Sequence, residues 1–122
     1  MKRCMIVDGS SVIRKVASRI LNGPDMIVVE AATGSDALSM CASDLPDIVV
    51  VDSRLPDMAA DDLIRRIAAL DPDFTPQIVI CMIEFDVGII MRARRAGAKG
   101  HLMKPFNRAQ LLERFRDLEL AA

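Results

Sequence analysis

The chain has 122 residues, 52% of them hydrophobic, and a formal net charge of −1 at pH 7. This length fits one domain with its own core, and the hydrophobic content excludes an intrinsically disordered chain. With 3% aromatic residues and no net positive charge, we expect no DNA partner. No apolar run approaches the roughly 18 residues that cross a bilayer and no signal peptide is evident, which predicts a soluble, cytoplasmic protein without a membrane partner.

Short apolar runs alternate with stretches of helical period along the chain. In chain order, we predict a strand at Arg3–Val7, a helix at Ser11–Leu21, a strand at Met26–Ala31, a helix at Gly34–Ser43, a strand ending at Asp52, a helix at Ala60–Leu70, a strand at Ile78–Met82, a helix at Asp86–Ala96, a strand at Gly100–Met103 and a helix at Arg108–Leu118. This alternation is typical of βαβ units with right-handed crossovers. We therefore predict an α/β fold with a five-stranded parallel sheet and helices on both faces.

Apolar residues at helical spacing mark the expected inward face of three helices. These residues are Val12, Val16 and Ile20 in the first helix, Leu63, Ile64, Ile67 and Leu70 in the third, and Leu111, Leu112, Phe115 and Leu118 in the last. We expect Ser10 or Ser11 to cap the first helix. The three cysteines lie among apolar neighbours without a CxxC spacing, so we predict reduced thiols in the core.

The run Ile48–Asp52 consists of four apolar residues, three of them valines, followed by one carboxylate. Such a run is typical of a parallel strand buried on both faces, and chemistry in these sheets gathers at the carboxyl ends of the strands. Two other predicted strands end beside Asp8 and Lys104. Two acids and a lysine at strand ends predict a small charged site. The alternatives are that Asp8 only caps the first helix and that Asp52 is only a capping or solvated acid.

These same residues carry a resemblance to a known family. Val7-Asp8, Pro46–Met58, Arg95–Gly100 and Lys104-Pro105-Phe106 resemble, in register, the receiver domain of two-component response regulators, and most of all the single-domain chemotaxis type. The resemblance implies a flavodoxin-like, doubly wound (βα)5 fold with strand order 2-1-3-4-5. It also implies one receiver domain over residues 1–122 without an output domain, and a signalling protein that is not an enzyme.

The resemblance also implies a role for each charged residue. Asp52 is expected to accept a phosphoryl group from a histidine kinase or phosphotransfer protein, and Lys104 to pair with the phosphoryl oxygens. Asp8, Asp52 and the backbone carbonyl of Arg54 are expected to hold Mg²⁺. A carboxylate can form an acyl phosphate only where the phosphoryl charge is offset, and Mg²⁺ prefers a few carboxylate oxygens plus waters. The peptide bond before Pro105 is expected to be cis.

The chain departs from the family pattern in its switching residues. Gly9 stands where an acid usually contacts the metal, so we expect weak Mg²⁺ binding. Met82 stands at the position of a serine or threonine, and a thioether cannot donate the hydroxyl hydrogen bond. His101 takes the position of the aromatic switch residue. We do not expect His101 to bind a metal, because the chain has no second histidine. Ala59 and Ala60 replace an Asp-Gly pair.

Several functions remain open at this point. The resemblance implies that downstream protein targets meet the fourth helix, fifth strand and fifth helix. A pseudo-receiver that binds partners without phosphorylation is the main alternative, and Gly9 and Met82 favour it. The basic cluster of Arg92, Arg94, Arg95 and Lys99 is either a solvated face or a site for a small anionic ligand. A flavodoxin-like enzyme is disfavoured, because the chain has no glycine-rich phosphate loop and no recognisable nucleophile arrangement.

Overall fold

The computed structural model describes residues 1–120 and contains one five-stranded sheet. In chain order the elements are β1 (Lys2–Val7), α1 (Ser11–Leu21), β2 (Met26–Ala31), α2 (Gly34–Ser43), β3 (Ile48–Asp52), α3 (Ala60–Ala68), β4 (Gln77–Met82), α4 (Val87–Ala96), β5 (Gly100–Met103) and α5 (Arg108–Asp117). The strand order is β2-β1-β3-β4-β5, and all neighbouring strands are parallel. The predicted fold class and strand order are confirmed.

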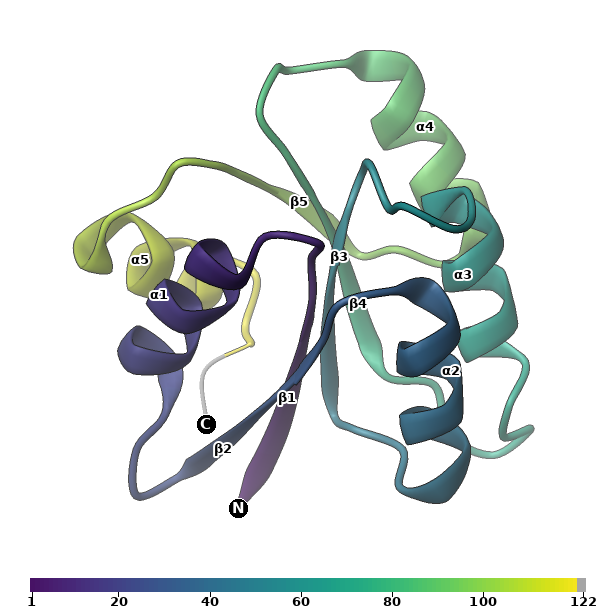
Figure 1. Cartoon of the computed structure of the whole chain (residues 1–122), viewed down its shortest axis with the longest axis horizontal. Helices are drawn as coiled ribbons and strands as arrows, with labels where there is room; N and C mark the ends of the chain where they lie inside the picture. The colour runs from purple at the N-terminus through teal and green to yellow at the C-terminus, as the bar shows by residue number, and fades with distance from the viewer. Residues whose placement is uncertain (121–122) are drawn as a thin grey trace.

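Helices α1 and α5 cover one face of the sheet, and α2, α3 and α4 cover the other (Figure 1). The central strand β3 is buried along its whole length. Val49 and Val51 belong to the core under α2–α4, whereas Ile48 and Val50 belong to the core under α1 and α5. Successive strand side chains point to opposite faces, so a continuous apolar run suits a strand that lies between two helical layers.

Side chains cap four helices at their first turn. Ser10 caps α1, Thr33 caps α2, Asp86 caps α4, and Asn107 forms a capping box with Gln110 at α5. An oxygen at this position satisfies a backbone N–H that has no partner inside the helix. Two predictions are refined by these caps. Asp86 precedes α4 and is not its first helical residue, and Asp8 does not cap α1.

The inward face of α1 differs from the prediction. Val12 and Val16 are 68% and 36% exposed, whereas Ile20, the third residue of the predicted face, is partly buried against the core. The buried residues of the helix are Ala17 and Leu21. Together with the half-buried Ile13, Ala17 and Leu21 form a second apolar row with a spacing of four residues. Because its central side chain is small, this row lets the helix lie close to the sheet. The two valines are left facing solvent.

The other differences concern the ends of elements. Helix α3 ends at Ala68, and Leu70, which we expected inside, is 41% exposed. In α5, Leu111 and Phe115 are buried as predicted, whereas Leu112 is 38% exposed. Strands β1 and β4 each begin one residue earlier than predicted. A terminal leucine in an apolar pattern therefore does not by itself extend a helix.

The three cysteines are free and buried, as predicted. Burial raises the pKa of Cys4 to about 12, that of Cys41 to about 11 and that of Cys81 to about 12. A thiol with such a pKa stays protonated near neutral pH and is a poor nucleophile. In residues 1–120, no helix is both long and apolar enough to span a membrane.

Candidate functional site

Three charged side chains meet at the carboxyl edge of the sheet. Asp8 follows the last residue of β1, Asp52 is the last residue of the central strand β3, and Lys104 follows the last residue of β5. All three are buried, with exposed fractions of 2%, 7% and 7%. Charged residues are rarely buried to this degree unless they are paired. The parallel strands bring these residues together because all their carboxyl ends lie at one edge.

The ammonium of Lys104 bridges the two acids. Its Nζ lies 2.6 Å from Oδ2 of Asp8 and 3.0 Å from Oδ1 of Asp52. Backbone groups also bind the carboxylates: the Ser10 N–H donates to Oδ1 of Asp8 at 2.8 Å, and the Arg54 N–H donates at 3.3 Å to Oδ1 of Asp52, the oxygen that Lys104 also contacts. Two carboxylates and one ammonium leave a local charge of about −1, which favours a further cation.

The pKa of Lys104 shows how the pairing outweighs burial. Burial alone lowers the pKa of the ammonium, but its hydrogen bonds to Asp8 and Asp52 raise it, and the net shift is upward. Lys104 is therefore charged at every physiological pH. The neighbouring backbone holds it in place, because the Lys104 N–H donates to the Met82 carbonyl at 2.9 Å. The bond between Lys104 and Pro105 is cis.

A cavity of about 200 Å³ opens beside Asp52 and Lys104. Its remaining walls come from the loop after β3, including Arg54, and from the loop after β4, including Glu84. Met82 lines the same cavity with a thioether, and its side chain is only 1% exposed. A thioether offers no hydrogen to an anion bound there. The cavity can therefore admit a phosphoryl-sized group, but Met82 provides no hydroxyl for it from β4; Ser53, in the loop after β3, also lines the cavity.

The position of Gly9 has room for a Cβ atom. A Cβ atom built on Gly9 would meet the Pro56 side chain at 3.9 Å and the Ala32 carbonyl at 4.0 Å, both ordinary contacts. Two nearby acids could replace the missing carboxylate, but Asp57 is engaged elsewhere. It accepts hydrogen bonds from the N–H groups of Gly34 and Ser35 at the start of α2, both at 2.9 Å, and these bonds lower its pKa. Glu84 is exposed and faces the cavity.

The site offers a limited set of metal ligands. Within residues 1–120, no group of three or more His, Cys, Asp or Glu side chains is arranged to hold a metal ion. Asp8 and Asp52 do converge on one cation, the Lys104 ammonium, and the Arg54 backbone lies against Asp52. Two carboxylates and a carbonyl suit an ion that keeps several waters, as Mg²⁺ does. These two carboxylates and the carbonyl could hold Mg²⁺, with waters completing its coordination.

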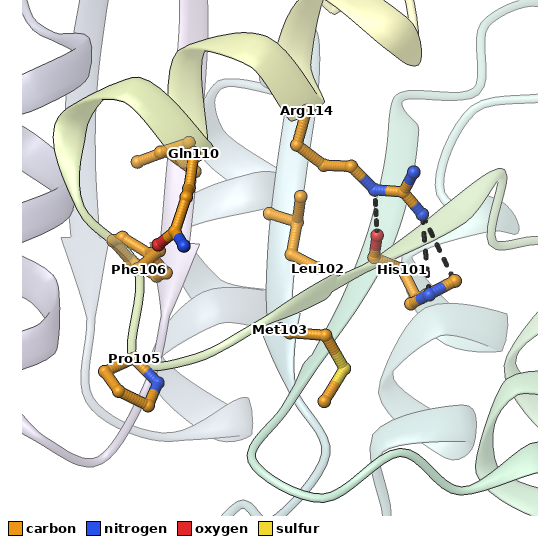
Figure 2. A pocket seen from close by; sticks show the side chains of 8 residues that line it. His101, Leu102, Met103, Pro105, Phe106, Gln110 and Arg114 are labelled. Carbon is orange, nitrogen blue, oxygen red and sulfur yellow. Dashed lines mark hydrogen bonds between the residues drawn. The ribbon is translucent and has the colours of Figure 1, made fainter.

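His101 is held by Arg114, a contact that sequence reasoning did not find. The Arg114 Nε donates to the His101 carbonyl at 2.9 Å, and its Nη2 lies 3.4 Å from each imidazole nitrogen. Equal distances place this nitrogen over the ring face, and Figure 2 shows the guanidinium reaching across the imidazole. Phe85 meets the ring edge-on, 5.7 Å between centroids. Burial, then the charges of Arg114 and Arg94, lower the pKa of His101.

His101 and Arg114 border a larger cavity of about 440 Å³ on β5 and α5. Phe106 and Gln110 line one side, and Arg114 and His101 line the other (Figure 2).

The predicted basic cluster lies on α4 and the residues after it. Arg92, Arg94, Arg95 and Lys99 are all exposed on α4 and its exit, as a solvated face would be. A small anionic ligand at this cluster stays a prediction.

Three comparisons with known proteins agree on the family. A model of the response regulator receiver domain matches residues 4–116. The chain is 31% identical over 113 residues to a chemotaxis protein CheY of Thermotoga maritima, which covers 92% of each chain. It is 26% identical over 106 residues to sporulation initiation phosphotransferase F of Bacillus subtilis, covering 87% of this chain and 84% of that one.

Solved structures show the same architecture. The chemotaxis response regulator CheY4 of Vibrio cholerae superposes with a TM-score of 0.87 at 27% identity, over 97% of this chain and 98% of that one. A receiver domain protein of Methanospirillum hungatei gives a TM-score of 0.86, also at 27% identity, over 98% and 94%. Proteins of this kind act in two-component signalling and are not classical enzymes. The chain belongs to the response regulator receiver domain family.

Proposed function

We propose that this receiver domain accepts a phosphoryl group on Asp52 and signals through protein partners. The shared ammonium of Lys104 carries the proposal, because it draws Asp8 and Asp52 together at the carboxyl edge of the sheet. The phosphoryl group comes from a histidine kinase or a phosphotransfer protein. The proposed location is the cytoplasm.

The two oxygens of Asp52 have different surroundings. Oδ1 receives the contacts from Lys104 and from the Arg54 N–H, which leaves Oδ2 as the nucleophile. Oδ2 attacks the phosphorus atom, the bond from phosphorus to the donor breaks, and its electron pair leaves with the donor. The product is an acyl phosphate. Phosphorylation adds roughly −1.5 to −2 charge, and the Lys104 ammonium offsets part of it without moving far.

We also propose that the site binds Mg²⁺, but only weakly. Receiver domains typically bind Mg²⁺, which neutralises phosphoryl charge when it is bound. Asp8, Asp52 and the Arg54 carbonyl would hold the ion in this chain. Gly9 supplies no carboxylate, so water has to complete the coordination. We therefore expect the ion to bind more weakly than to a receiver that has two adjacent acids after β1.

Intact-protein mass spectrometry tests the acceptor. The protein is incubated with a small acyl phosphate, with and without Mg²⁺, and we expect the mass of one phosphoryl group to be added. Asp52→Asn should remain unlabelled, whereas the matched Asp8→Asn variant should keep the nucleophile and lose only the dependence on Mg²⁺. Labelling of Asp52→Asn at the wild-type rate would refute the assignment of Asp52.

The proposed docking surface for a downstream protein is the face formed by α4, β5 and α5. Large apolar side chains are exposed there, including Phe85 at 63%, Val87 at 60%, Met91 at 49% and Met103 at 38%. Helix α4 also carries the exposed Arg92, Arg94 and Arg95, and the 440 Å³ cavity beside Arg114 lies on β5 and α5. A partner with apolar and acidic side chains complements this surface.

A pseudo-receiver is the second candidate, because Gly9 and Met82 remove a metal ligand and a phosphoryl hydrogen-bond donor. In that case the docking surface would work without phosphorylation. Asp52→Asn separates the two functions when partner binding is measured by calorimetry. If the protein is a phosphorylated receiver, the phosphorylated wild type should bind the partner more tightly than Asp52→Asn does. If it is a pseudo-receiver, wild type and Asp52→Asn should bind the partner equally well.

A further inference from the structure

Asp8 is held at its main chain as well as at its carboxylate. Its N–H donates to the Ala31 carbonyl at 3.1 Å, and its own carbonyl accepts a 2.7 Å hydrogen bond from Nη1 of Arg14. Its two carboxylate oxygens accept from the Ser10 N–H and from Lys104. The residue is thus fixed on four sides. Arg14 provides a charged side chain that contacts Asp8 from helix α1, outside the charged site.

Arg14 is itself oriented by a partner on β2. Its Nε donates to Oε1 of Glu30 at 3.2 Å, and its side chain is only 16% exposed. Glu30 also accepts from Lys15 at 2.9 Å and from Ser18 at 3.2 Å. These hydrogen bonds, led by that of Lys15, lower the pKa of Glu30 despite the cost of burial. The planar guanidinium therefore spans two fixed acceptors, the Glu30 carboxylate and the Asp8 carbonyl.

Arg14 binds the carbonyl of the Asp8–Gly9 peptide, and the glycine itself does little to restrain this peptide. Gly9 follows Asp8 in the bend between β1 and α1, and a Cβ atom there would meet nothing closer than 3.9 Å. Glycine has more backbone freedom than any other residue, so the Asp8–Gly9 peptide can rotate unless another group holds it. A bound carbonyl on Asp8 restricts that rotation and, with it, the direction of the Asp8 carboxylate.

We propose that Arg14, oriented by Glu30, is a positioning residue that aims the Asp8 carboxylate at the cation site. Gly9 supplies no carboxylate beside Asp8. The cation site therefore depends on Asp8 more than a site with two adjacent acids after β1 would. Arg14 contacts the Asp8 main chain and acts through it. The consequence for Mg²⁺ rests on the proposed function, whereas the restraint on Asp8 does not.

The test compares Arg14→Ala with Lys15→Ala. Lys15 is the matched control, because it lies next in the same helix and binds the same Glu30, but its ammonium contacts Glu30 and not Asp8. Calorimetric titration with Mg²⁺ should show a ten- to hundredfold weaker affinity for Arg14→Ala and a change of less than about twofold for Lys15→Ala. Arg14→Lys should fall between them, since an ammonium cannot span both acceptors.

A second measurement needs no metal. Hydrogen exchange of the Ser10 amide, which donates to the Asp8 carboxylate, should become about tenfold faster in Arg14→Ala and stay unchanged in Lys15→Ala. Equal effects of the two variants, or no effect of Arg14→Ala, would overturn the proposal. If the wild-type protein binds no Mg²⁺, the metal part of the proposed function fails and the exchange rate of Ser10 alone decides the role of Arg14.

Discussion

The ammonium of Lys104 lies closer to Asp8 than to Asp52, at 2.6 Å against 3.0 Å. Asp8 is also the more deeply buried of the two acids, at 2% against 7% exposed. The lysine is therefore anchored on β1 and reaches toward the end of the central strand. This arrangement keeps one carboxylate oxygen of Asp52 out of the ion pair while the charge of both acids is partly neutralised.

The first prediction concerns the stability that this shared ammonium provides. Lys104→Met should leave two buried carboxylates without a cation, and removing one partner of a buried pair costs about 3–5 kcal/mol. Asp8→Asn should cost less, because Lys104 keeps Asp52 and the asparagine oxygen can still accept from Ser10. Urea unfolding of the two variants measures the difference. Equal losses would show that Lys104 depends on both acids alike.

The second prediction concerns the vacant position beside Asp8. Gly9→Asp should tighten Mg²⁺ binding by one to two decades, since losing even an indirect partner of a metal typically costs ten- to hundredfold in affinity. The space around Gly9 accepts a Cβ atom without a clash. Gly9→Ala is the control, because it adds the Cβ atom without the carboxylate. Calorimetric titration compares the three proteins.

Equal Mg²⁺ affinities for wild type and Gly9→Asp would show that another acid already compensates. Glu84 is then the group to remove, because it faces the cavity beside Asp52. Asp57 is less available, since both its carboxylate oxygens bind the first N–H groups of α2. Glu84→Gln should weaken Mg²⁺ binding in that case and leave it unchanged otherwise.

Some parts of the site follow from sequence and others do not. Asp8, Asp52 and Lys104 each stand at the end of an apolar run, and parallel strands bring such ends to one edge, so their meeting is predictable. Arg114 is different. It lies 13 residues from His101 and contacts it only because α5 packs beside β5. No local pattern separates such an arginine from a solvated one.

In helix α1, the sequence alone likewise does not predict which residues are buried or where Arg14 lies. Its sequence contains two apolar rows, one with Val12 and Val16 and one with Ala17 and Leu21, and periodicity alone does not choose between them. The choice depends on how closely the helix approaches the sheet, which is a tertiary property. The same rotation of α1 places Arg14 over Asp8. A glutamate near the end of β2, facing basic residues of α1, is the signal in the sequence that could have found this pair.

The third prediction concerns the missing hydroxyl of β4. Met82→Thr should enlarge the structural response of α4 and β5 to phosphorylation, because the hydroxyl can donate to the phosphoryl group. Met82→Val is the matched control, with the shape of threonine and no hydroxyl. Both variants should lose roughly 1–3 kcal/mol of stability from the smaller buried side chain. Amide chemical shifts before and after phosphorylation measure the response, and equal responses of the two variants would contradict the prediction.

The fourth prediction concerns pH and His101. Burial, then the charges of Arg114 and Arg94, hold the pKa of the imidazole below its ordinary value. An unfolded histidine titrates near pH 6.5, so as the pH falls through that value the unfolded chain takes up a proton before the folded chain does. The contribution of His101 to the free energy of unfolding is therefore complete above about pH 7. It is lost as the pH falls toward the pKa of His101 in the folded chain.

His101→Phe isolates this contribution, because it keeps a ring between Arg114 and Phe85 and removes the titration. The difference in free energy of unfolding between wild type and His101→Phe should be constant above about pH 7 and should move in favour of the variant from about pH 7 to 5. Other titrating groups cancel in this difference. Arg114→Gln removes the nearest charge, so it should reduce the slope. A difference that stays constant over the whole range would show that the folded chain takes up the His101 proton as readily as the unfolded chain.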